Sequence, residues 1–288
     1  MVIMPTNLKG YIFDYRVGYV REGCVLPGFD VLGENVNNTI VALGGYTTPE
    51  QAKTRNSWAD SLLESLGGSS KVKVICGCTD GYTSAQEMTR YIRDVILLKP
   101  KLVIIVSGFY NIAYKLGLVK DKEIAKILKT YPFTTPRQID FIRYITSRFG
   151  FGNDEVYYGE KNNLPAFEYW LGHMDIINTL CSQFGQKLMI CLQPCVFSGN
   201  YQISERERSE IKQLFDIDDK QFEALYTAFK TEFQNFVKIA ELRDYIANFS
   251  GLFDYECEVY EDAVHAKCEF TAKLGNEIAE YCIRKALI

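Results

Sequence analysis

The apolar residues of the chain gather in short runs separated by longer stretches of mixed character. Four of these runs are rich in Val, Ile and Leu and lie near glycines, which favours strands over helices. Because each run is apolar along most of its length, we expect both faces of these strands to be buried, as in a parallel sheet. The predicted strands are residues 39–43, 72–76, 102–106 and 188–192.

The stretches between these runs carry apolar residues at helical spacing. Over residues 84–98 the apolar side chains fall on one face, and Pro100 ends the pattern. Ser204 and Glu207 match the capping box that opens a helix, and Asp218 is suited to cap a second, long helix. The predicted helices cover 58–66, 84–98, 138–149, 167–184 and 269–287, with two more beginning after Ser204 and after Asp218.

Strands and helices alternate along the chain, which predicts an α/β sandwich with a mostly parallel sheet. No linker rich in proline, glycine or serine divides the sequence, so we expect a single domain over residues 1–288. Two long helical or irregular insertions, near 112–165 and 196–250, are expected to cap one rim of the sheet. Sites in such sheets form at the carboxyl ends of the strands. The residues that follow each strand are therefore the candidates for function.

Composition and charge narrow the class of protein. The chain has 288 residues, of which 47% are hydrophobic and 24% charged, with a net charge of −4. These values are typical of a globular protein and exclude collagen-like and disordered classes. The 32 basic residues are scattered, so we expect no nucleic-acid partner. No apolar stretch reaches the roughly 18 residues of a membrane span, and residues 1–15 lack the apolar core of a secretory signal.

The cysteines indicate a reducing compartment and no metal site. The chain has nine cysteines, an odd number, and several lie in apolar runs, which is typical of buried free thiols in the cytoplasm. The pairs Cys76 and Cys78, and Cys191 and Cys195, do not match the spacing of zinc ligands. The two histidines lie far apart in the sequence. We therefore expect a cytoplasmic protein without a bound metal.

Four segments rich in glycine, hydroxyl and ionisable residues stand at the predicted strand ends or before the last helix. Each segment alone is weak evidence for a functional site, because a glycine after a strand often serves only the backbone conformation. None carries the lysine of a phosphate-binding loop or the spacing of a dinucleotide-binding loop, so no cofactor is expected. The segments are GGYTT at 44–48, GCTDGYTS at 77–84, SGFYN at 107–111 and EDAVH at 261–265.

In this order and spacing, the four segments resemble the sequence blocks of the SGNH/GDSL hydrolase family. The similarity runs along nearly the whole chain, and it is greatest to the branch encoded with bacterial surface-polysaccharide synthesis genes. The resemblance implies a three-layer, flavodoxin-like fold and the hydrolysis or transfer of acyl esters, usually on acylated sugars. Further matching segments are PGFD at 27–30, SW at 57–58, GYTSAQE at 81–87, LQP at 192–194 and GNE at 275–277.

The resemblance also implies roles for single residues. In the family a serine attacks the acyl carbon, a histidine takes its proton, and an aspartate three residues earlier orients the histidine. Asp262 and His265 match that pair, and Gly81 matches a glycine whose amide stabilises the oxyanion. The other two signature positions hold tyrosine. Tyr46 stands where the family has the serine, and Tyr110 stands where it has the oxyanion asparagine.

The two substitutions leave the chemistry open. A phenol has a pKa near 10 and its oxygen lies further from the backbone than a serine hydroxyl, so the usual serine mechanism is unavailable. Our first hypothesis is a binding or regulatory protein that keeps the pocket without the conventional catalysis. In a second hypothesis the enzyme is active through a one-residue shift: Thr47 is the nucleophile for His265 and Asn111 the oxyanion donor. Gly45 and Gly108 would line the same pocket.

A third hypothesis makes Tyr46 itself the nucleophile, with His265 as base and Tyr110 as hydrogen-bond donor, since tyrosine nucleophiles exist in sialidases. Purely structural interpretations compete with all three. The tyrosines can plug the cleft, Asp262 can cap the approach to the last helix, and Gly81 can serve a turn that needs a positive φ. In each functional hypothesis the partner is a small molecule or an acylated saccharide.

Overall fold

The structure is a computed structural model, and it describes residues 11–14, 18–21, 30–33, 38–45, 57–79, 81–116, 118 and 165–288. Tyr46 and Thr47 lie outside the described residues. So do the helix expected over 138–149 and most of the insertion expected at 112–165.

Within the described residues, six strands form one sheet in the order β3, β5, β4, β6, β7, β8. Neighbouring strands pair in parallel, except that β3 runs antiparallel to β5. Taken in chain order, the five parallel strands lie in the order 2-1-3-4-5 of a flavodoxin-like sheet. The strands are β3 (Asp30–Leu32), β4 (Thr39–Gly44), β5 (Lys73–Cys76), β6 (Leu102–Ser107), β7 (Lys187–Leu192) and β8 (Ile246–Asn248). A separate hairpin joins β1 (Tyr11–Asp14) to β2 (Gly18–Arg21).

All four predicted strands are confirmed, as β4, β5, β6 and β7. Burial explains their apolar sequences, because every residue of β6 is buried and β4 and β7 expose only their first residues. The sequence analysis missed β3 and β8, which lie at the two edges of the sheet and are three residues long. Since β8 falls within residues 196–250, part of that expected insertion belongs to the sheet.

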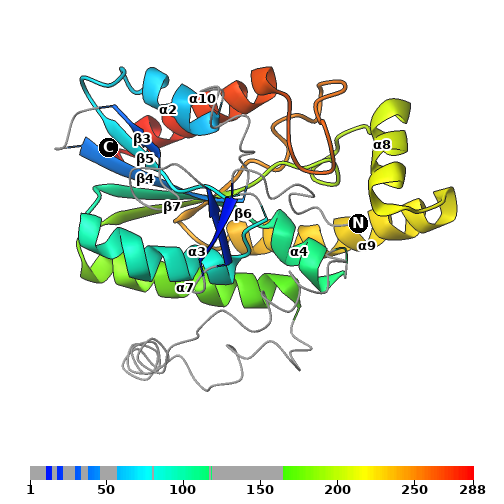
Figure 1. Cartoon of the computed structure of the whole chain (residues 1–288), viewed down its shortest axis with the longest axis horizontal. Coiled ribbons are helices and arrows are strands. Elements are labelled where there is room, and N and C mark those ends of the chain that lie inside the picture. The colour runs from blue at the N-terminus through cyan, green and yellow to red at the C-terminus, as the bar shows by residue number, and fades with distance from the viewer. Residues whose placement is uncertain are drawn as a thin grey trace.

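Helices cover both faces of the sheet and complete a three-layer α/β/α sandwich (Figure 1). Helices α2 and α10 lie together on one face, and α3, α4, α7 and α9 lie on the other, while α8 stands to one side. None of the helices in the described part of the chain has an apolar stretch long enough to cross a membrane. The helices are α2 (Trp58–Ser65), α3 (Ser84–Arg90), α4 (Phe109–Lys115), α7 (Ala166–Gln183), α8 (Glu205–Phe215), α9 (Asp219–Ala240) and α10 (Cys268–Arg284).

Side-chain caps fix where several helices begin. The predicted capping box of Ser204 and Glu207 opens α8, and Asp218 caps α9 by accepting the backbone N–H of Gln221 at 2.8 Å. A third capping box, formed by Ser57 and Asp60, opens α2. Such caps satisfy backbone donors that have no partner within the helix.

The helix predicted over 84–98 is present, but its helix type changes along its length. Its first part is α3, followed by a π-helical turn over Tyr91–Val95 and a 3-10 turn over Ile96–Leu98. A buried hydrogen bond of 2.7 Å from the Tyr91 hydroxyl to Gln186 anchors the beginning of the π turn. Lys99 then ends the helix in the left-handed conformation, just before Pro100.

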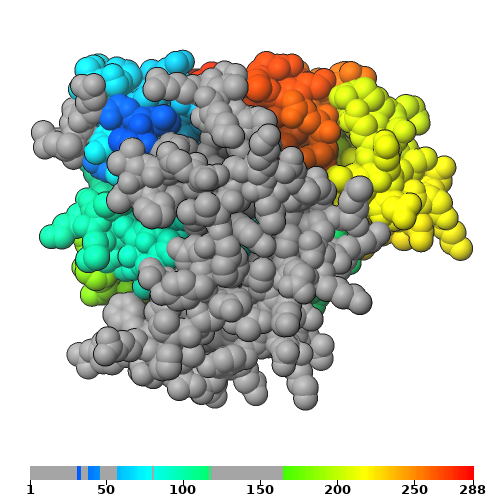
Figure 2. All heavy atoms as spheres, viewed as in Figure 1, coloured from blue at the N-terminus to red at the C-terminus, as the bar shows by residue number. Residues whose placement is uncertain are grey.

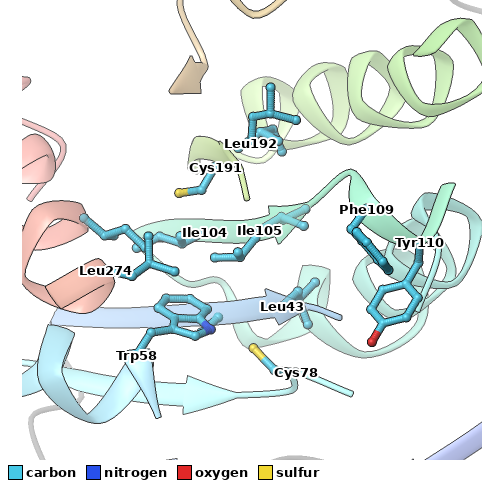
Figure 3. Packing of buried hydrophobic residues seen from close by; sticks show 14 of the residues in the cluster. Leu43, Trp58, Cys78, Ile104, Ile105, Phe109, Tyr110, Cys191, Leu192 and Leu274 are labelled. Atoms are coloured by element: carbon cyan, nitrogen blue, oxygen red, sulfur yellow. The ribbon is translucent and has the colours of Figure 1, made fainter. Parts of the chain in front are cut away.

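The apolar core extends from the strands into both helical layers (Figure 3). Trp58 of α2 and Leu274 of α10 pack in the same cluster as Leu43 of β4, Ile104 of β6 and Leu192 of β7. The two helices approach closely, because a Cβ atom on Gly275 of α10 would lie 2.3 Å from the carbonyl oxygen of Trp58.

Candidate active site

The carboxyl ends of β4 and β6 lie side by side at the centre of the sheet. Gly44 at the end of β4 pairs with Val106 of β6, so the segments that follow both strands start from adjacent positions. The chain continues from β4 to β5 on one side and from β6 to β7 on the other, which makes this the switch point of the sheet. Gly44 has φ +130°, and a Cβ atom there would lie 2.0 Å from the carbonyl oxygen of Val106. Only glycine fits this turn.

Tyr110 fills the space beside the turn after β4. Gly108, with φ +125°, allows α4 to begin directly after β6, which places Tyr110 in the first turn of that helix. A Cβ atom on Gly45 would lie 2.6 Å from Cδ2 of the Tyr110 ring, so the ring rests against the backbone of Gly45. Phe109 meets the ring edge-on, with the centroids 5.2 Å apart, and Tyr110 is 2% exposed. The ring is thus a packed part of the site.

Asp262 and His265 form a hydrogen-bonded pair in the loop before α10. Oδ2 of Asp262 lies 2.7 Å from Nδ1 of His265. The other carboxylate oxygen accepts the backbone N–H groups of Val264 and His265, both at 2.7 Å. The loop therefore holds the aspartate by its own backbone while the aspartate orients the imidazole. When Nδ1 donates to the carboxylate, Nε2 is left as the basic nitrogen.

The charge of Asp262 follows from two opposing effects. Burial alone would raise the pKa of Asp262, but the charge interaction with His265, their hydrogen bond and the backbone donors lower that pKa below its usual value. The carboxylate is therefore ionised at neutral pH and stabilises a proton on the imidazole. A pair with these properties can act as a general base towards a hydroxyl that reaches Nε2.

The hydroxyl that the structure places near Nε2 of His265 belongs to Tyr110, at 3.4 Å. The base expected from the sequence and the substituted oxyanion position thus lie together, although they are 155 residues apart in the chain. Gly81 is buried and has φ +82°, which explains a glycine at that position. The catalytic roles that the resemblance implies for these residues remain predictions.

Asn111, the residue after Tyr110 in α4, is hydrogen-bonded to Ser84 at the beginning of α3. Its Nδ2 donates to Oγ of Ser84 at 2.8 Å, and its Oδ1 accepts the backbone N–H of Ser84 at 3.1 Å. Oγ of Ser84 also lies 2.8 Å from Nδ1 of His173, and burial lowers the pKa of His173 to about 3, so this imidazole is neutral. With these bonds in place, Asn111 has only the second N–H of its Nδ2 to offer an oxyanion.

A second buried chain of polar side chains, which the sequence analysis did not single out, lies next to the beginning of α4, the helix that carries Tyr110. Nε1 of Trp170 donates to Oγ of Ser107 at 3.1 Å, and Ser107 donates to Oε2 of Glu87 at 2.7 Å. Burial raises the pKa of Glu87 to about 8, although the bond from Ser107 opposes the shift. The signal in the sequence was a serine ending an apolar strand and a glutamate on the apolar face of a helix.

The described part of the chain contains no cluster of three potential metal ligands. No three His, Cys, Asp or Glu side chains gather there closely enough to hold an ion.

Comparison with known proteins gives similarity in fold and none in sequence. No protein family profile matches the chain, and no curated protein is significantly similar to it. Solved structures of similar fold include GDSL-like lipases, acylhydrolases and acetylxylan esterases. Likenesses at this level of identity leave function open.

Three of these structures illustrate the range of similarity to this chain. A GDSL-like lipase from Bacteroides thetaiotaomicron has a TM-score of 0.43 and 15% identity, over 87% of each chain. A lipolytic protein of the G-D-S-L family from Desulfitobacterium hafniense has a TM-score of 0.48 and 14% identity, over 85% of this chain and 99% of that one. An acetylxylan esterase from Geobacillus stearothermophilus has a TM-score of 0.45 and 13% identity, over 88% of this chain and 94% of that one.

Proposed function

We propose that this chain is an SGNH/GDSL hydrolase-like protein that binds a small polar ligand, of the acylated-saccharide class, and lacks conventional serine catalysis. One observation carries the proposal. The Tyr110 ring lies against Gly45, and its hydroxyl lies 3.4 Å from Nε2 of His265. A phenol thus stands beside the base, where a conventional enzyme would hold its nucleophile or the oxyanion of the intermediate.

The chemistry of a buried phenol favours binding over turnover. A tyrosine hydroxyl stays protonated near neutral pH, so it donates and accepts hydrogen bonds but is a poor nucleophile. Losing a member of a catalytic triad typically costs several orders of magnitude in rate. The Tyr110 hydroxyl and the His265 imidazole together offer a donor and an acceptor, which suits a sugar hydroxyl or an acyl carbonyl.

A second candidate function is an active ester hydrolase or acyltransferase on the same scaffold. The geometry of Asp262 favours it, since three hydrogen bonds at 2.7 Å hold the carboxylate on His265 as a catalytic dyad requires. The nucleophile in this case would be Thr47 or Tyr46, which follow Gly45 after the end of β4 in the sequence.

Hydrolysis and binding assays separate the two candidates. We expect wild type, His265→Ala and Asp262→Asn to hydrolyse p-nitrophenyl acetate at the same background rate. Acetylated xylo-oligosaccharides should perturb the NMR signals of the site in wild type, and Tyr110→Ala should abolish the perturbation. A rate at least tenfold above background that is lost in His265→Ala would overturn the binding proposal in favour of the active enzyme.

Restoring the family's residues provides a second test. We expect the double variant Tyr46→Ser with Tyr110→Asn to gain esterase activity that depends on His265, because the Asp–His pair is already formed. The same double variant with His265→Ala is the matched control and should be inactive. No gain in the double variant would count against an SGNH-like site.

The cellular setting belongs to the same proposal. We infer a cytoplasmic protein connected with the modification of surface polysaccharide. The compartment is supported by eight free cysteines among the described residues. The link to polysaccharide rests on the resemblance of the sequence blocks.

A further inference from the structure

The first turn of α8 holds a carboxylate with more hydrogen bonds than a cap requires. Glu207 is the third helical residue, and its Oε2 accepts the backbone N–H of Ser204 at 3.0 Å and the Ser204 hydroxyl at 2.9 Å. These bonds complete the capping box. Its other oxygen, Oε1, plays no part in that cap, yet the residue is only 1% exposed.

Oε1 of Glu207 binds the segment that leads into the Asp262–His265 loop. It accepts the backbone N–H of Tyr260 at 2.9 Å and the hydroxyl of Tyr201 at 2.7 Å. The same Tyr201 oxygen accepts the backbone N–H of Val259 at 3.0 Å. Two successive peptide groups are thus held by one carboxylate and the phenol bound to it.

The clamped segment is the stem of the loop. Tyr260 and Ala266 form an antiparallel bridge, and the N–H of Glu261 donates to the carbonyl of His265 at 2.9 Å. Nη2 of Arg206 also donates to the carbonyl of Tyr260, at 3.3 Å. Figure 2 shows the orange surface of this region directly beside the yellow-green surface of α8. Asp262 lies within the bridged loop, so the position of the stem determines the position of the Asp262–His265 pair.

We propose that Glu207 is a positioning residue for His265, acting through Tyr260 and Tyr201 to hold the loop that carries the Asp262–His265 pair. The inference deepens the proposed function and rests on it only in giving His265 a role at the site. The contacts of Oε1 distinguish this positioning role from capping. The cap uses Oε2 and Ser204, whereas the loop is held through Oε1. Hydrogen bonds to a buried carboxylate are stronger than neutral ones, which suits a clamp on a loop.

The two histidines of the chain make the test direct, because each gives one set of imidazole NMR signals. His173 is fully buried against Ser84 and serves as the internal reference. We expect Glu207→Ala to broaden or remove the hydrogen-bonded Nδ1–H signal of His265 and to leave the imidazole signals of His173 in place. Amide exchange at Tyr260 should accelerate at least about tenfold, as expected for loss of a hydrogen bond to a charged group.

Three further variants separate the clamp from the cap. Ser204→Ala weakens the cap alone and should leave the His265 signal and Tyr260 exchange unchanged. Glu207→Gln keeps an oxygen that can accept both loop donors, so it should retain the His265 signal. Should Glu207→Ala fail to fold, Tyr201→Phe provides the test, with faster exchange at Val259 as the expected result.

Either of two results would overturn the proposal. The first is that folded Glu207→Ala keeps the wild-type His265 signal and the wild-type exchange rate at Tyr260. Where Tyr201→Phe is used instead, the corresponding result is an unchanged exchange rate at Val259. The other is an equal loss of the His265 signal in Ser204→Ala, which would reduce Glu207 to a cap. The measurement uses neither ligand nor substrate, so failure of the proposed function would leave its outcome readable.

Discussion

Glu87, Ser107 and Trp170 show how a polar residue is tolerated inside the sandwich. Their hydrogen bonds run from α7 through the end of β6 to α3, next to the beginning of α4, the helix that carries Tyr110. Burial favours the protonated form of Glu87, because an ionised carboxylate would lose its hydration without gaining a cationic partner. The site is thus backed by a carboxyl group that is largely neutral at pH 7.

The raised pKa of Glu87 predicts how stability depends on pH. Between pH 4.5 and about 8 the folded chain keeps a proton that the unfolded chain releases. Glu87 therefore reduces stability as pH rises, by at most about 1.4 kcal/mol per pH unit. We expect Glu87→Gln to remove this slope from urea unfolding measured at pH 5.5 and 7.5. Glu64→Gln, an exposed carboxylate on α2, is the control, and equal slopes in wild type and Glu87→Gln would contradict the prediction.

Single residues of the site differed in how far the sequence could predict them. The pairing of Asp262 with His265 is local, and the resemblance of the sequence blocks implied it. The approach of Tyr110 to His265 joins positions 155 residues apart and follows only from the order of the strands. The second role of Glu207 was hidden because the capping box already accounted for a glutamate at that position.

Elements with strong periodicity and clear caps were predictable, and those without were not. The first residues of α8 and α9 follow from Ser204 and Asp218, whose side chains bind early backbone donors of each helix. Strands β3 and β8 are too short to show a pattern of burial. The π turn after α3 begins at Tyr91, whose hydroxyl binds Gln186, 95 residues away in the chain, and no local pattern predicts it.

The contact between α2 and α10 predicts an unusual response to a helical glycine. Replacing glycine by alanine inside a helix normally stabilises it by about 1 kcal/mol. At Gly275 the added Cβ would lie 2.3 Å from the Trp58 carbonyl, so the helices must move apart. We expect Gly275→Ala to lower the free energy of unfolding by about 2 kcal/mol. Glu280→Ala, on the exposed face of α10, should be nearly neutral, and a stabilised Gly275→Ala would show that the helices are further apart.

For the whole molecule, alternation along the sequence was sufficient to predict the class of fold. Apolar runs separated by helical stretches imply a parallel sheet covered on both faces, because parallel strands need crossover connections. The order of the strands and the position of the switch point came from the structure. They place GGYTT and SGFYN after neighbouring strands, which is why the Tyr110 ring rests against Gly45.

The distribution of thiols predicts a chemical measure of the folded state. Six of the described cysteines are buried, and Cys257 and Cys268 are exposed. Burial also raises the pKa of Cys181, Cys195 and Cys282 to about 12, which suppresses their thiolates.

In a Cys24→Ser background, we expect Ellman's reagent to modify two thiols rapidly and six only as the protein unfolds. Cys257→Ser in that background should reduce the fast count to one. Rapid reaction of a third thiol would show that part of the core opens without global unfolding.

The packing of α10 over α2 has a consequence for synthesis on the ribosome. Trp58 and Leu62 emerge long before the helix that covers them, which begins at Cys268. Until then this apolar face stays open to water and to other chains, as in other partly made α/β domains. A ribosome that stalls before Cys268 would hold a nascent chain whose parallel strands are all synthesised while one face of the sheet lacks α10. Chaperone demand should therefore persist until α10 has emerged, and stop codons within α10 should yield insoluble chains.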